Sequence, residues 1–515
     1  MQHPEPSPTD ESADAGVAPA AGLQAPEATR GDRPGRRRWG LIALGVAGLL
    51  VAAGTGLVLY EAHSSRLQAG TLSRYASQLE FQVEPWASDR VRFPSHGPFD
   101  QRLGYTLIPG FVERLKSRGF VVAEQARQSP ALLDHLDRGL YAPYVEKTQA
   151  GLTVYDCHRQ PVYAFAYPYR RFERFEQVPV LLGQILLFIE NRDLLDTDRP
   201  QMNPAVDWVR FTRAVIGQLG SRIDPELDTP GGSTLATQIE KFRHSPDGIT
   251  HDAREKLRQM ASAAVRAYRQ GADTLPARRQ ILLDYLNTVP LSAARRHGEV
   301  HGLGDGLWVW FGTDLERAHD LLTPALGVAA DPAERAQVLR QVVALMVAHR
   351  RPSWYLAQGR DDLEQTTDAH LRLLAAEGLI DDGWRDAALR QRLAFRDFSR
   401  DPPQWPASPG KGTTAARSRL AGWLGTSLYN LDRLDASLDS TLHSGLQEHV
   451  TDFLGRLTDP EFARAQGLIG ERLLQPASMG EVRYSFTLLE RTDSGNQVRV
   501  QTDTTGQPLD INEGS

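Results

Sequence analysis

The most constraining feature of this 515-residue chain is a stretch without charged residues, WGLIALGVAGLLVAAGTGLVLY, which runs from Trp39 to Tyr60. At roughly 1.5 Å per residue, a helix of this length can cross a hydrocarbon layer of about 30 Å. A cleaved signal peptide would have a shorter apolar segment and a small-residue cleavage site close behind it, whereas this stretch leads directly into Glu61. We therefore expect an uncleaved membrane anchor at residues 39–60.

The residues around the anchor predict its orientation. Residues 1–35 are rich in Pro, Ala, Gly, Glu and Asp and offer few large apolar side chains to bury, which is typical of a disordered tail. Arginines at 36–38 precede the apolar stretch, and an aromatic residue marks each of its ends. Because basic residues favour the cytoplasmic side, we expect residues 1–38 to form a disordered cytoplasmic tail and everything after residue 60 to lie outside.

Composition excludes several classes of function. A formal net charge of -6 at pH 7 gives no sign of a surface that binds a phosphate backbone, so we expect no nucleic-acid partner. The single cysteine, Cys157, excludes an internal disulfide and a zinc site of the CxxC type, and we interpret it as a buried or idle thiol. No metal ligands are predicted.

Hydrophobic patterning predicts the elements beyond the anchor. Residues 61–150 form a polar, membrane-proximal region with helices near 109–118 and 130–140, and they suggest no chemistry. Alternation from Gly151 to Tyr167 predicts a β-hairpin with its turn at 157–160. Helical spacing then predicts three helices, at 178–190, 253–268 and 278–287.

Two of these helices are expected to have distinct faces. The first buries an apolar side: Val180, Leu181, Ile185, Phe188 and Ile189. The second packs with Leu257, Met260, Ala261, Ala264 and Tyr268. Around that packed side lie basic residues, which usually form a solvated face: Arg254, Lys256, Arg258, Arg266 and Arg269.

Glu190, at the end of the first of these helices, is the leading candidate for chemistry. A carboxylate at the end of an apolar helix is partly desolvated, which raises its pKa, while Arg192 two residues later would lower it. This balance suits a general base. The alternative is a solvated glutamate paired with Arg192.

The stretch TPGGSTLATQIEK, from Thr229 to Lys241, predicts a loop that leads into a helix. Gly231 and Gly232 allow the backbone to approach a ligand, and Ser233 or Thr234 can cap the helix. The free N–H groups at such a helix start favour an anion such as phosphate. An ordinary capped helix start is the alternative reading.

A glycine-rich segment, GEVHGLGDGLWVWFG, spans residues 298–312. A dinucleotide loop needs a preceding strand inside a βαβ unit. We expect neither here, so this segment does not predict a nucleotide site.

Several motifs together resemble a known family. In order and spacing, six segments are similar to the successive motifs of family 51 glycosyltransferases, the peptidoglycan polymerase modules of class A penicillin-binding proteins and monofunctional transglycosylases: ENRDL at Glu190, NPAVDWVRFTRAV from Asn203, GGSTLATQIEK from Gly231, EKLRQM from Glu255, ILLDYLN from Ile281, and GEVHGLGDGLWVWFG from Gly298. The resemblance covers about residues 165–350. It implies a mainly α, lysozyme-like glycosyltransferase domain at 151–350, followed by a helical extension at 351–399.

The resemblance also implies an activity and a location. Such enzymes polymerise lipid II, as the 4-hydroxyl of an acceptor sugar attacks the anomeric carbon of a lipid-pyrophosphate donor with inversion. The implied partners are lipid II, the nascent glycan strand, the inner membrane of a bacterium and other cell-wall synthesis proteins. A divalent cation, Mg²⁺ or Mn²⁺, is compatible with this chemistry, and no other cofactor is implied.

Residue roles follow from the matching motifs. Glu190 matches the general base, and Gln259 occupies the position of a second important glutamate, so the resemblance implies that both are catalytic residues. The substrate-binding positions implied by the resemblance are Arg192, Gly231, Gly232, Ser233, Thr234, Gln238, Lys241, Lys256 and Asn287.

The chain departs from the family at several of these motifs. An amide at Gln259 cannot stabilise charge as a glutamate does, although Glu255 lies one helical turn away. Asn191 replaces the usual Asp, Leu195 to Asp198 offer no His, and Thr237 and Phe242 replace a Gln and an Asn. These changes leave a catalytically weak or inactive scaffold as the alternative function. A lysozyme-like hydrolase is a third hypothesis, which the phosphate-favouring loop at Gly231 argues against.

The C-terminal part is expected to contain a linker and a further region. Residues 400–425 are rich in Pro, Gly and Ser, which predicts a linker. Residues 426–515 resemble the start of a transpeptidase region, with a hairpin whose turn lies at 493–496. Its catalytic motifs are missing, because the Ser-x-x-Lys at Ser408 lies in the linker, the Ser-x-Asn at Ser494 lies at the hairpin tip, and there is no Lys-Thr-Gly.

Overall fold

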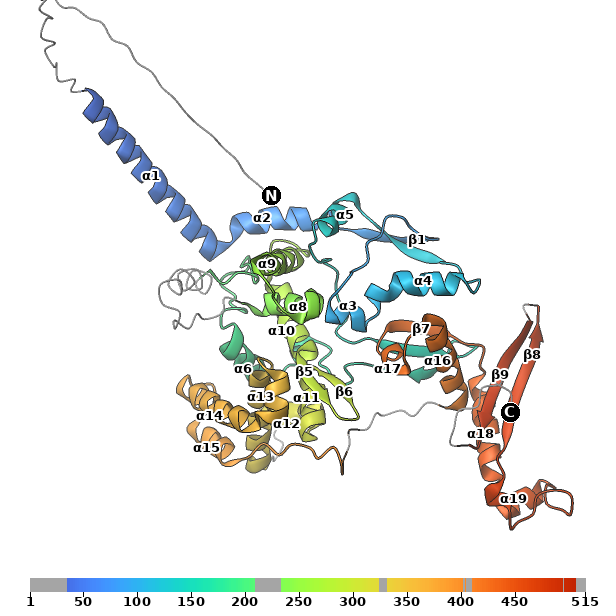
Figure 1. Cartoon of the computed structure of the whole chain (residues 1–515). Coiled ribbons are helices and arrows are strands. Elements are labelled where there is room, and N and C mark those ends of the chain that lie inside the picture. The colour runs from blue at the N-terminus through green and yellow to red at the C-terminus, as the bar shows by residue number, and fades with distance from the viewer. Residues whose placement is uncertain are drawn as a thin grey trace, which may run out of the picture. The chain divides into compact units, whose positions relative to one another are not determined.

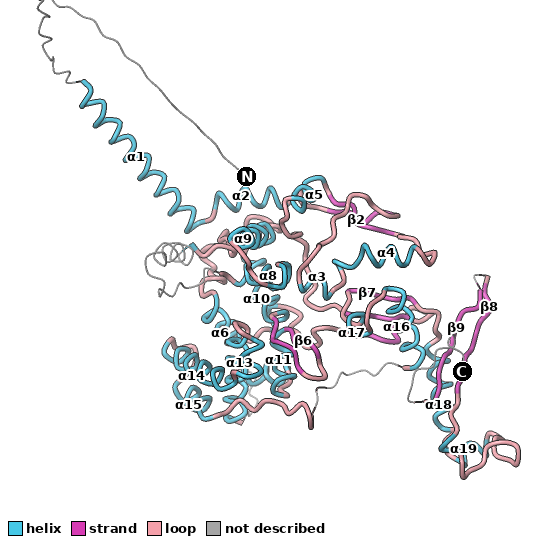
Figure 2. The backbone as a smooth tube through the Cα atoms, in the orientation of Figure 1, coloured by secondary structure: helices cyan, strands magenta, loops and turns pink. Residues whose placement is uncertain are grey.

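The computed structural model describes residues 35–208, 233–323, 331–401, 403, 410–493 and 495–505 (Figure 1). Contacts within the chain define two units, Met1–Leu59 and Tyr60–Ser515. Helices dominate, and the strands form only two- and three-stranded sheets among the described residues (Figure 2). This confirms the mainly helical fold class.

Helix α1, Gly35–Ser64, contains the expected anchor. From Leu44 to Ser64 it has a mean hydropathy of 1.7 and is long and apolar enough to cross a membrane. Its side chains from 44 to 60 are exposed, as expected of a helix that faces lipid. The expected tail is wrong at its end, because residues 35–38 are helical and arginine is a good helix former. Residues 1–34 lie outside the described part.

Short helices and one sheet follow the anchor. The carboxylate of Glu61 caps the next helix, accepting hydrogen bonds from the backbone N–H groups of Leu67 and Gln68 at 2.9 and 2.8 Å. Strands β1, Phe81–Pro85, and β2, Glu124–Gln128, pair antiparallel, which we did not predict. The two expected helices are confirmed as α4 and α5. The helical elements here are α2 (Arg66–Ala76), α3 (Pro98–Arg102), η1 (Tyr105–Leu107), α4 (Ile108–Lys116) and α5 (Pro130–Asp137).

A three-stranded sheet links distant parts of the second unit. Strands β3, Gly151–Tyr155, and β4, Pro161–Ala164, form the expected antiparallel hairpin. Cys157 lies in the turn of this hairpin and is exposed, so of the expected buried or idle thiol the burial is wrong. Strand β7, Asp435–Asp439, lies parallel to β3 on its other edge.

The largest apolar core lies in the middle of the chain. Its elements are η2 (Phe175–Gln177), α6 (Val180–Glu190), α8 (Leu235–His244), η3 (Pro246–Gly248), α9 (Ala253–Ala267), α10 (Leu275–Thr288), β5 (Pro290–Ala294), β6 (Gly298–His301), α11 (Gly302–Phe311), α12 (Leu315–Leu322), α13 (Pro332–Ala348), η5 (Trp354–Gln358), α14 (Arg360–Ala376) and α15 (Asp382–Arg390). Helix α13 is buried along most of its length and contacts α6, α11, α12, α14 and α15. The helical extension expected after residue 350 is therefore present as α14 and α15.

Two expected helix faces are wrong in detail. On α9, Leu257 is 62% exposed and Ala261 is also exposed, whereas Glu255 and Gln259 are buried. Ala264 and Tyr268 are buried as expected, but the rest of the buried side of α9 is made mainly of polar and small residues, so the expected face is rotated from the observed one. On α6, Val180 is 77% exposed because it is the first residue of the helix and precedes the buried turns.

The glycine-rich segment also differs from the expectation. A strand, β6, does precede the glycines, but it pairs antiparallel with β5 in a two-stranded ribbon. No βαβ unit forms around it, so the absence of a dinucleotide loop still follows. Gly302 begins α11 with φ +77, where a side chain would collide with the backbone oxygen of Asn287.

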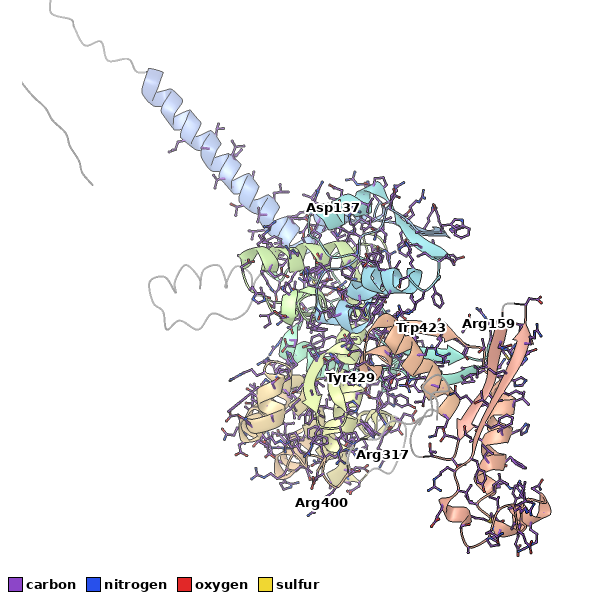
Figure 3. The ribbon with its side chains drawn as sticks, turned by 45° about the vertical axis from the view of Figure 1, so that its right-hand side comes forward. Asp137, Arg159, Arg317, Arg400, Trp423 and Tyr429 are labelled. Carbon is purple, nitrogen blue, oxygen red and sulfur yellow. The ribbon has the colours of Figure 1, made fainter. Side chains whose placement is uncertain are left out.

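The C-terminal part is more ordered than predicted. Residues Lys411–Leu424 form helix α16, so the linker expected at 400–425 is wrong there, because this stretch contains good helix formers and ends at Gly425. Trp423 of α16 packs against Phe120 with ring centroids 5.5 Å apart, and Figure 3 labels it. The remaining elements are α17 (Leu428–Leu431), α18 (Ser444–Arg456), α19 (Pro460–Ala465), η6 (Met479–Glu481), and the expected hairpin of β8 (Ser485–Thr492) and β9 (Gly495–Asp503).

The transpeptidase-like motifs have no catalytic arrangement among the described residues. Ser408 and Ser494 lie outside those residues. Lys411 is the first residue of α16, and its ammonium group donates to the backbone oxygen of Thr505 at 2.6 Å and pairs with Asp503 at 3.2 Å. This lysine therefore fastens α16 to the end of β9.

Candidate functional site

The site is built around Glu190, the last residue of α6. Helix α6 is apolar because it packs on α13, and its residues Leu182, Ile185 and Leu186 are buried. The helix ends where Asn191 adopts non-helical dihedral angles (φ -160, ψ 74). Glu190 is therefore held at the edge of the core with only 7% of its surface exposed, as the sequence predicted.

The two carboxylate oxygens of Glu190 have different neighbours. Oε2 accepts a hydrogen bond from the side-chain amide of Gln238 at 2.8 Å. Oε1 accepts a hydrogen bond from the guanidinium of Arg350 at 3.2 Å and lies 3.4 Å from Nε2 of His349. The structure thus joins residues from α6, α8 and the end of α13.

Tyr285 of α10 supports this arrangement. Its hydroxyl donates to Oε1 of Gln238 at 3.3 Å, and its ring contacts His349 edge to face at 5.8 Å between centroids. Burial and the charge of Glu190 raise the pKa of Tyr285 well above its ordinary value. Tyr285 therefore stays protonated and fixes the orientation of Gln238.

The start of α8 confirms the predicted helix cap. Thr234 is the N-cap, and its side chain accepts a hydrogen bond from the backbone N–H of Thr237 at 3.3 Å. Ser233, next to the cap, accepts a hydrogen bond from the ammonium of Lys256 at 2.7 Å. Gly231 and Gly232 lie outside the described residues.

Two partly buried lysines add positive charge near Glu190. Burial lowers the pKa of Lys241, and the nearby charge of Glu190 opposes this shift. Burial, with a smaller effect from the charge of Lys241, lowers the pKa of Lys256 to about 8. With a pKa of about 8, Lys256 is still mainly protonated at pH 7. With Arg350, whose side chain is 46% exposed, the two lysines form a cationic group that an anionic ligand can reach.

Gln259 lies in a different environment from Glu190. Its amide donates to Ser245 and Thr250, each at 2.9 Å, and the side chain is fully buried. Glu255, the alternative carboxylate, accepts hydrogen bonds from Ser245 at 2.6 Å and from Arg258 at 2.8 Å. These contacts tie the loop after α8 to α9, and they do not bring either side chain to Glu190.

Two other predicted positions have local partners. Arg192 pairs with Glu377 at 3.3 Å and lies over the ring of Phe188 at 4.3 Å. Asn287 is buried and makes two hydrogen bonds with the backbone of Phe172, at 3.0 and 2.7 Å. Asn287 thus joins the end of α10 to the segment before α6.

Sequence reasoning gave no role to Tyr285, His349 or Arg350. Their proximity to Glu190 depends on the packing of α6, α10 and α13, which no local pattern reports. One signal was present: the polar residues 349–351 directly follow the apolar stretch of α13, just as Glu190 ends the apolar α6.

Behind α8, on the face opposite Gln238 and Lys241, lies a buried charge network. His244 contacts Asp100 at 2.7 Å and Glu146 at 2.6 Å. Glu146 also pairs with Arg243 at 2.6 Å and Arg266 at 2.8 Å. A cavity of about 290 Å³ borders this network. Glu190 does not line that cavity, so the cavity is separate from the site at Glu190. We interpret the network as the support that fixes α8.

No group of three or more His, Cys, Asp or Glu side chains is arranged for a metal ion within the described ranges. We therefore assign no residues to the divalent cation considered above.

Comparison with known proteins gave one family match. Residues 158–374 match the family model described as Transglycosylase. The matched segment begins in the turn between β3 and β4, includes Glu190 and residues 349–350, and ends within α14. No curated protein matches the chain.

Proposed function

We propose, from the premise that residues 158–374 are a family 51 glycosyltransferase domain, that the chain polymerises lipid II into peptidoglycan glycan strands. The domain itself supports peptidoglycan glycosyltransferase activity in general and implies a lipid II or glycan-strand substrate. The observation that carries the finer proposal is the buried carboxylate of Glu190 beside the cations Lys241 and Arg350.

In this proposal Glu190 is the general base. The 4-hydroxyl of the acceptor sugar gives its proton to the Glu190 carboxylate as the oxygen attacks the anomeric carbon of the donor. The bond to the lipid pyrophosphate breaks on the opposite face, so the configuration inverts. Gln238 supports this role, because its hydrogen bond to Oε2 fixes the carboxylate plane.

The cationic group stabilises the leaving pyrophosphate. Negative charge builds on the phosphate oxygens as the bond breaks, and fixed cations in a partly buried site stabilise that charge. Lys241, Lys256 and Arg350 are assigned to this task. Ser233 and Thr234 position the start of α8, and Gly231 and Gly232 stay predicted contacts to the donor.

The remaining predicted residues receive supporting roles. Gln259 holds Ser245 and Thr250, Asn287 holds Phe172, and Arg192 acts at the surface next to Glu377. None of these roles needs charge at position 259. The buried contacts of Gln259 therefore weaken its earlier assignment as a catalytic group and its use as an argument for an inactive scaffold.

The expected membrane anchor supports a proposal for the cellular location of the enzyme. A helix near the N-terminus that is able to span a membrane fits a membrane-anchored enzyme. We propose the bacterial inner membrane, with the arginines at 36–38 on the cytoplasmic side and the glycosyltransferase domain outside. This places the site on the side of the membrane where glycan strands are assembled.

The test is polymerisation of labelled lipid II by detergent-purified protein. The parent is compared with Glu190→Gln, which keeps the side-chain shape and removes the base. We expect glycan chains from the parent and a loss of about a hundredfold or more in the variant, as removal of a general base can cause. Circular dichroism confirms equal folding. A folded parent that makes no polymer would favour the scaffold, and cleavage of finished peptidoglycan without polymer would favour the hydrolase.

A further inference from the structure

His349 lies at the end of α13, against the carboxylate of Glu190. Its side chain is 9% exposed, as is that of Glu190. Nδ1 contacts the backbone oxygen of Met346 at 2.5 Å, and Nε2 lies 3.4 Å from Oε1 of Glu190. The imidazole is thus held between a carbonyl on one side and the proposed general base on the other.

The carbonyl fixes the tautomer of the ring. A carbonyl oxygen only accepts hydrogen bonds, so the proton of a neutral imidazole is on Nδ1. Nε2 then presents a lone pair to Oε1 of Glu190, which is also an acceptor when ionised. Two acceptors form no hydrogen bond with each other. One additional proton between these two atoms would complete the contact.

Burial favours the neutral form of His349 in the absence of substrate. Burial lowers the pKa of His349, and the charges of Arg350 and Lys241 lower it further, while Glu190 and the Met346 carbonyl raise it. The ring of Tyr285 is the other group that faces the imidazole, and it stays uncharged. A bound pyrophosphate would offset the charges of Arg350 and Lys241. The imidazole would then accept a proton more readily.

We propose that His349 receives, through Glu190, the proton that the acceptor hydroxyl releases during glycosyl transfer. The assignment rests on the proposed polymerase function. It makes His349 a positioning residue and proton acceptor behind the general base, since it touches Glu190 and not the sugar.

The acceptor O–H bond breaks as its oxygen bonds to the anomeric carbon, and the proton bonds to Oε1 of Glu190. The electron pair of the broken glycosyl–phosphate bond leaves with the lipid pyrophosphate. The new O–H of Glu190 donates to Nε2 of His349, and transfer along that bond gives an imidazolium and restores the carboxylate. The imidazolium returns its proton to water after the products leave.

The test compares His349→Gln with the matched control His370→Gln. His370 on α14 makes the same kind of contact, from Nδ1 to the backbone oxygen of Thr366 at 2.8 Å, but it has no role in the site. We expect kcat for lipid II polymerisation to fall about tenfold to a hundredfold in His349→Gln and to be unchanged in His370→Gln. A structural role alone could also lower kcat.

The pH profile separates these roles. Loss of activity at acidic pH reports the uptake of one proton shared by Glu190 and His349. Without the imidazole, protonated Glu190 loses its acceptor, so the acidic limb of kcat/KM should move to lower pH in His349→Gln. A lower rate with an unmoved acidic limb overturns the proposal and leaves a packing role.

Nitrogen NMR of histidine-labelled protein gives a second readout that needs no turnover. The His349 signal is assigned by its loss in His349→Gln, and it should show the Nδ1–H tautomer at neutral pH. Glu190→Gln should lower the pKa of His349, because the charge that raises it is removed. An Nε2–H tautomer, or a pKa of His349 that Glu190→Gln does not move, overturns the proposal.

A parent without polymerase activity overturns the proposed function and the proton transfer together. An active parent with unchanged activity in His349→Gln overturns only the proton transfer.

Discussion

At the scale of single residues, the surroundings of a side chain decide its chemistry more than its place in a motif. Glu190 and Glu255 are both buried carboxylates on helices. The hydrogen bonds to Glu255 come from neutral hydroxyls and from Arg258 on its own helix. Glu190 instead lies beside Lys241 and Arg350, which can bind a second anion. Of these two carboxylates, the surroundings of Glu190 are therefore the ones that fit the proposed general base beside a leaving pyrophosphate.

Gln259 gives a prediction at this scale. We expect Gln259→Glu to destabilise the protein by roughly 3 kcal/mol without increasing polymerisation, because a buried carboxylate cannot donate the two hydrogen bonds of the amide. Ser245 already donates to Glu255, so its proton is not free for a new carboxylate. Urea unfolding measures the change in the free energy of unfolding.

The matched control for this change is Gln259→Met, which removes the amide without adding charge. It should cost less, about 1–2 kcal/mol, since no charge is buried. If Gln259→Glu is instead as stable as the parent and more active, the carboxylate belongs to the site and position 259 is catalytic.

At the scale of elements, α8 is the helix whose placement matters most. One face presents Gln238 and Lys241 to Glu190, and the opposite face is fixed by the charge network around His244. Burial acts against the charged imidazole, but Glu146 and Asp100 outweigh it and raise the pKa of His244 to about 10. The stability of this support should therefore depend on pH.

The sign of that dependence follows from the raised pKa. The contribution of His244 to stability is fully present below its unfolded pKa of about 6.5 and is lost as the pH rises through about 10. We expect the free energy of unfolding to fall between these values in the parent. His244→Gln should be less stable and should lose this component, whereas His370→Gln should keep it. Equal pH slopes in the parent and His244→Gln would contradict the assignment.

Elements with strong local signals were predictable from the sequence, and those that depend on distant partners were not. The run of apolar residues before Glu190 predicted α6, and Thr234 predicted the cap of α8. The buried face of α9 was missed because it is polar and pairs with the loop after α8. Likewise, the contact of His349 with Glu190 joins residues 159 positions apart in sequence, and no periodicity predicts it.

At the scale of the whole second unit, the C-terminal part is folded against the earlier part of the chain. Strand β7 extends the β3–β4 hairpin, and the apolar cluster beneath it combines Leu152 and Val154 with Leu424 and Leu431. Tyr429, labelled in Figure 3, accepts a hydrogen bond from the backbone N–H of Glu299 at 3.1 Å. The family match covers residues 158–374, and these contacts join the C-terminal part to β3, which directly precedes the matched segment, and to β6 within it.

This arrangement predicts that the glycosyltransferase domain needs the segment from α16 to β7. A chain that stops after Arg400 should expose Leu152 and Val154, and at about 1.5–3 kcal/mol for each large apolar side chain this costs roughly 3–6 kcal/mol. A chain that stops after Ser444 keeps β7 and the contact of Ser444 with Asp156 at 2.6 Å, so it should lose less stability.

Thermal unfolding and lipid II polymerisation are measured for both shortened chains and for the full chain. We expect a clearly lower Tm and weaker activity only for the shorter chain, since its β3 edge has no partner strand. If both shortened chains have the same Tm and activity as the full chain, the segment from α16 to β7 does not stabilise the domain. The domain then folds from the earlier residues alone.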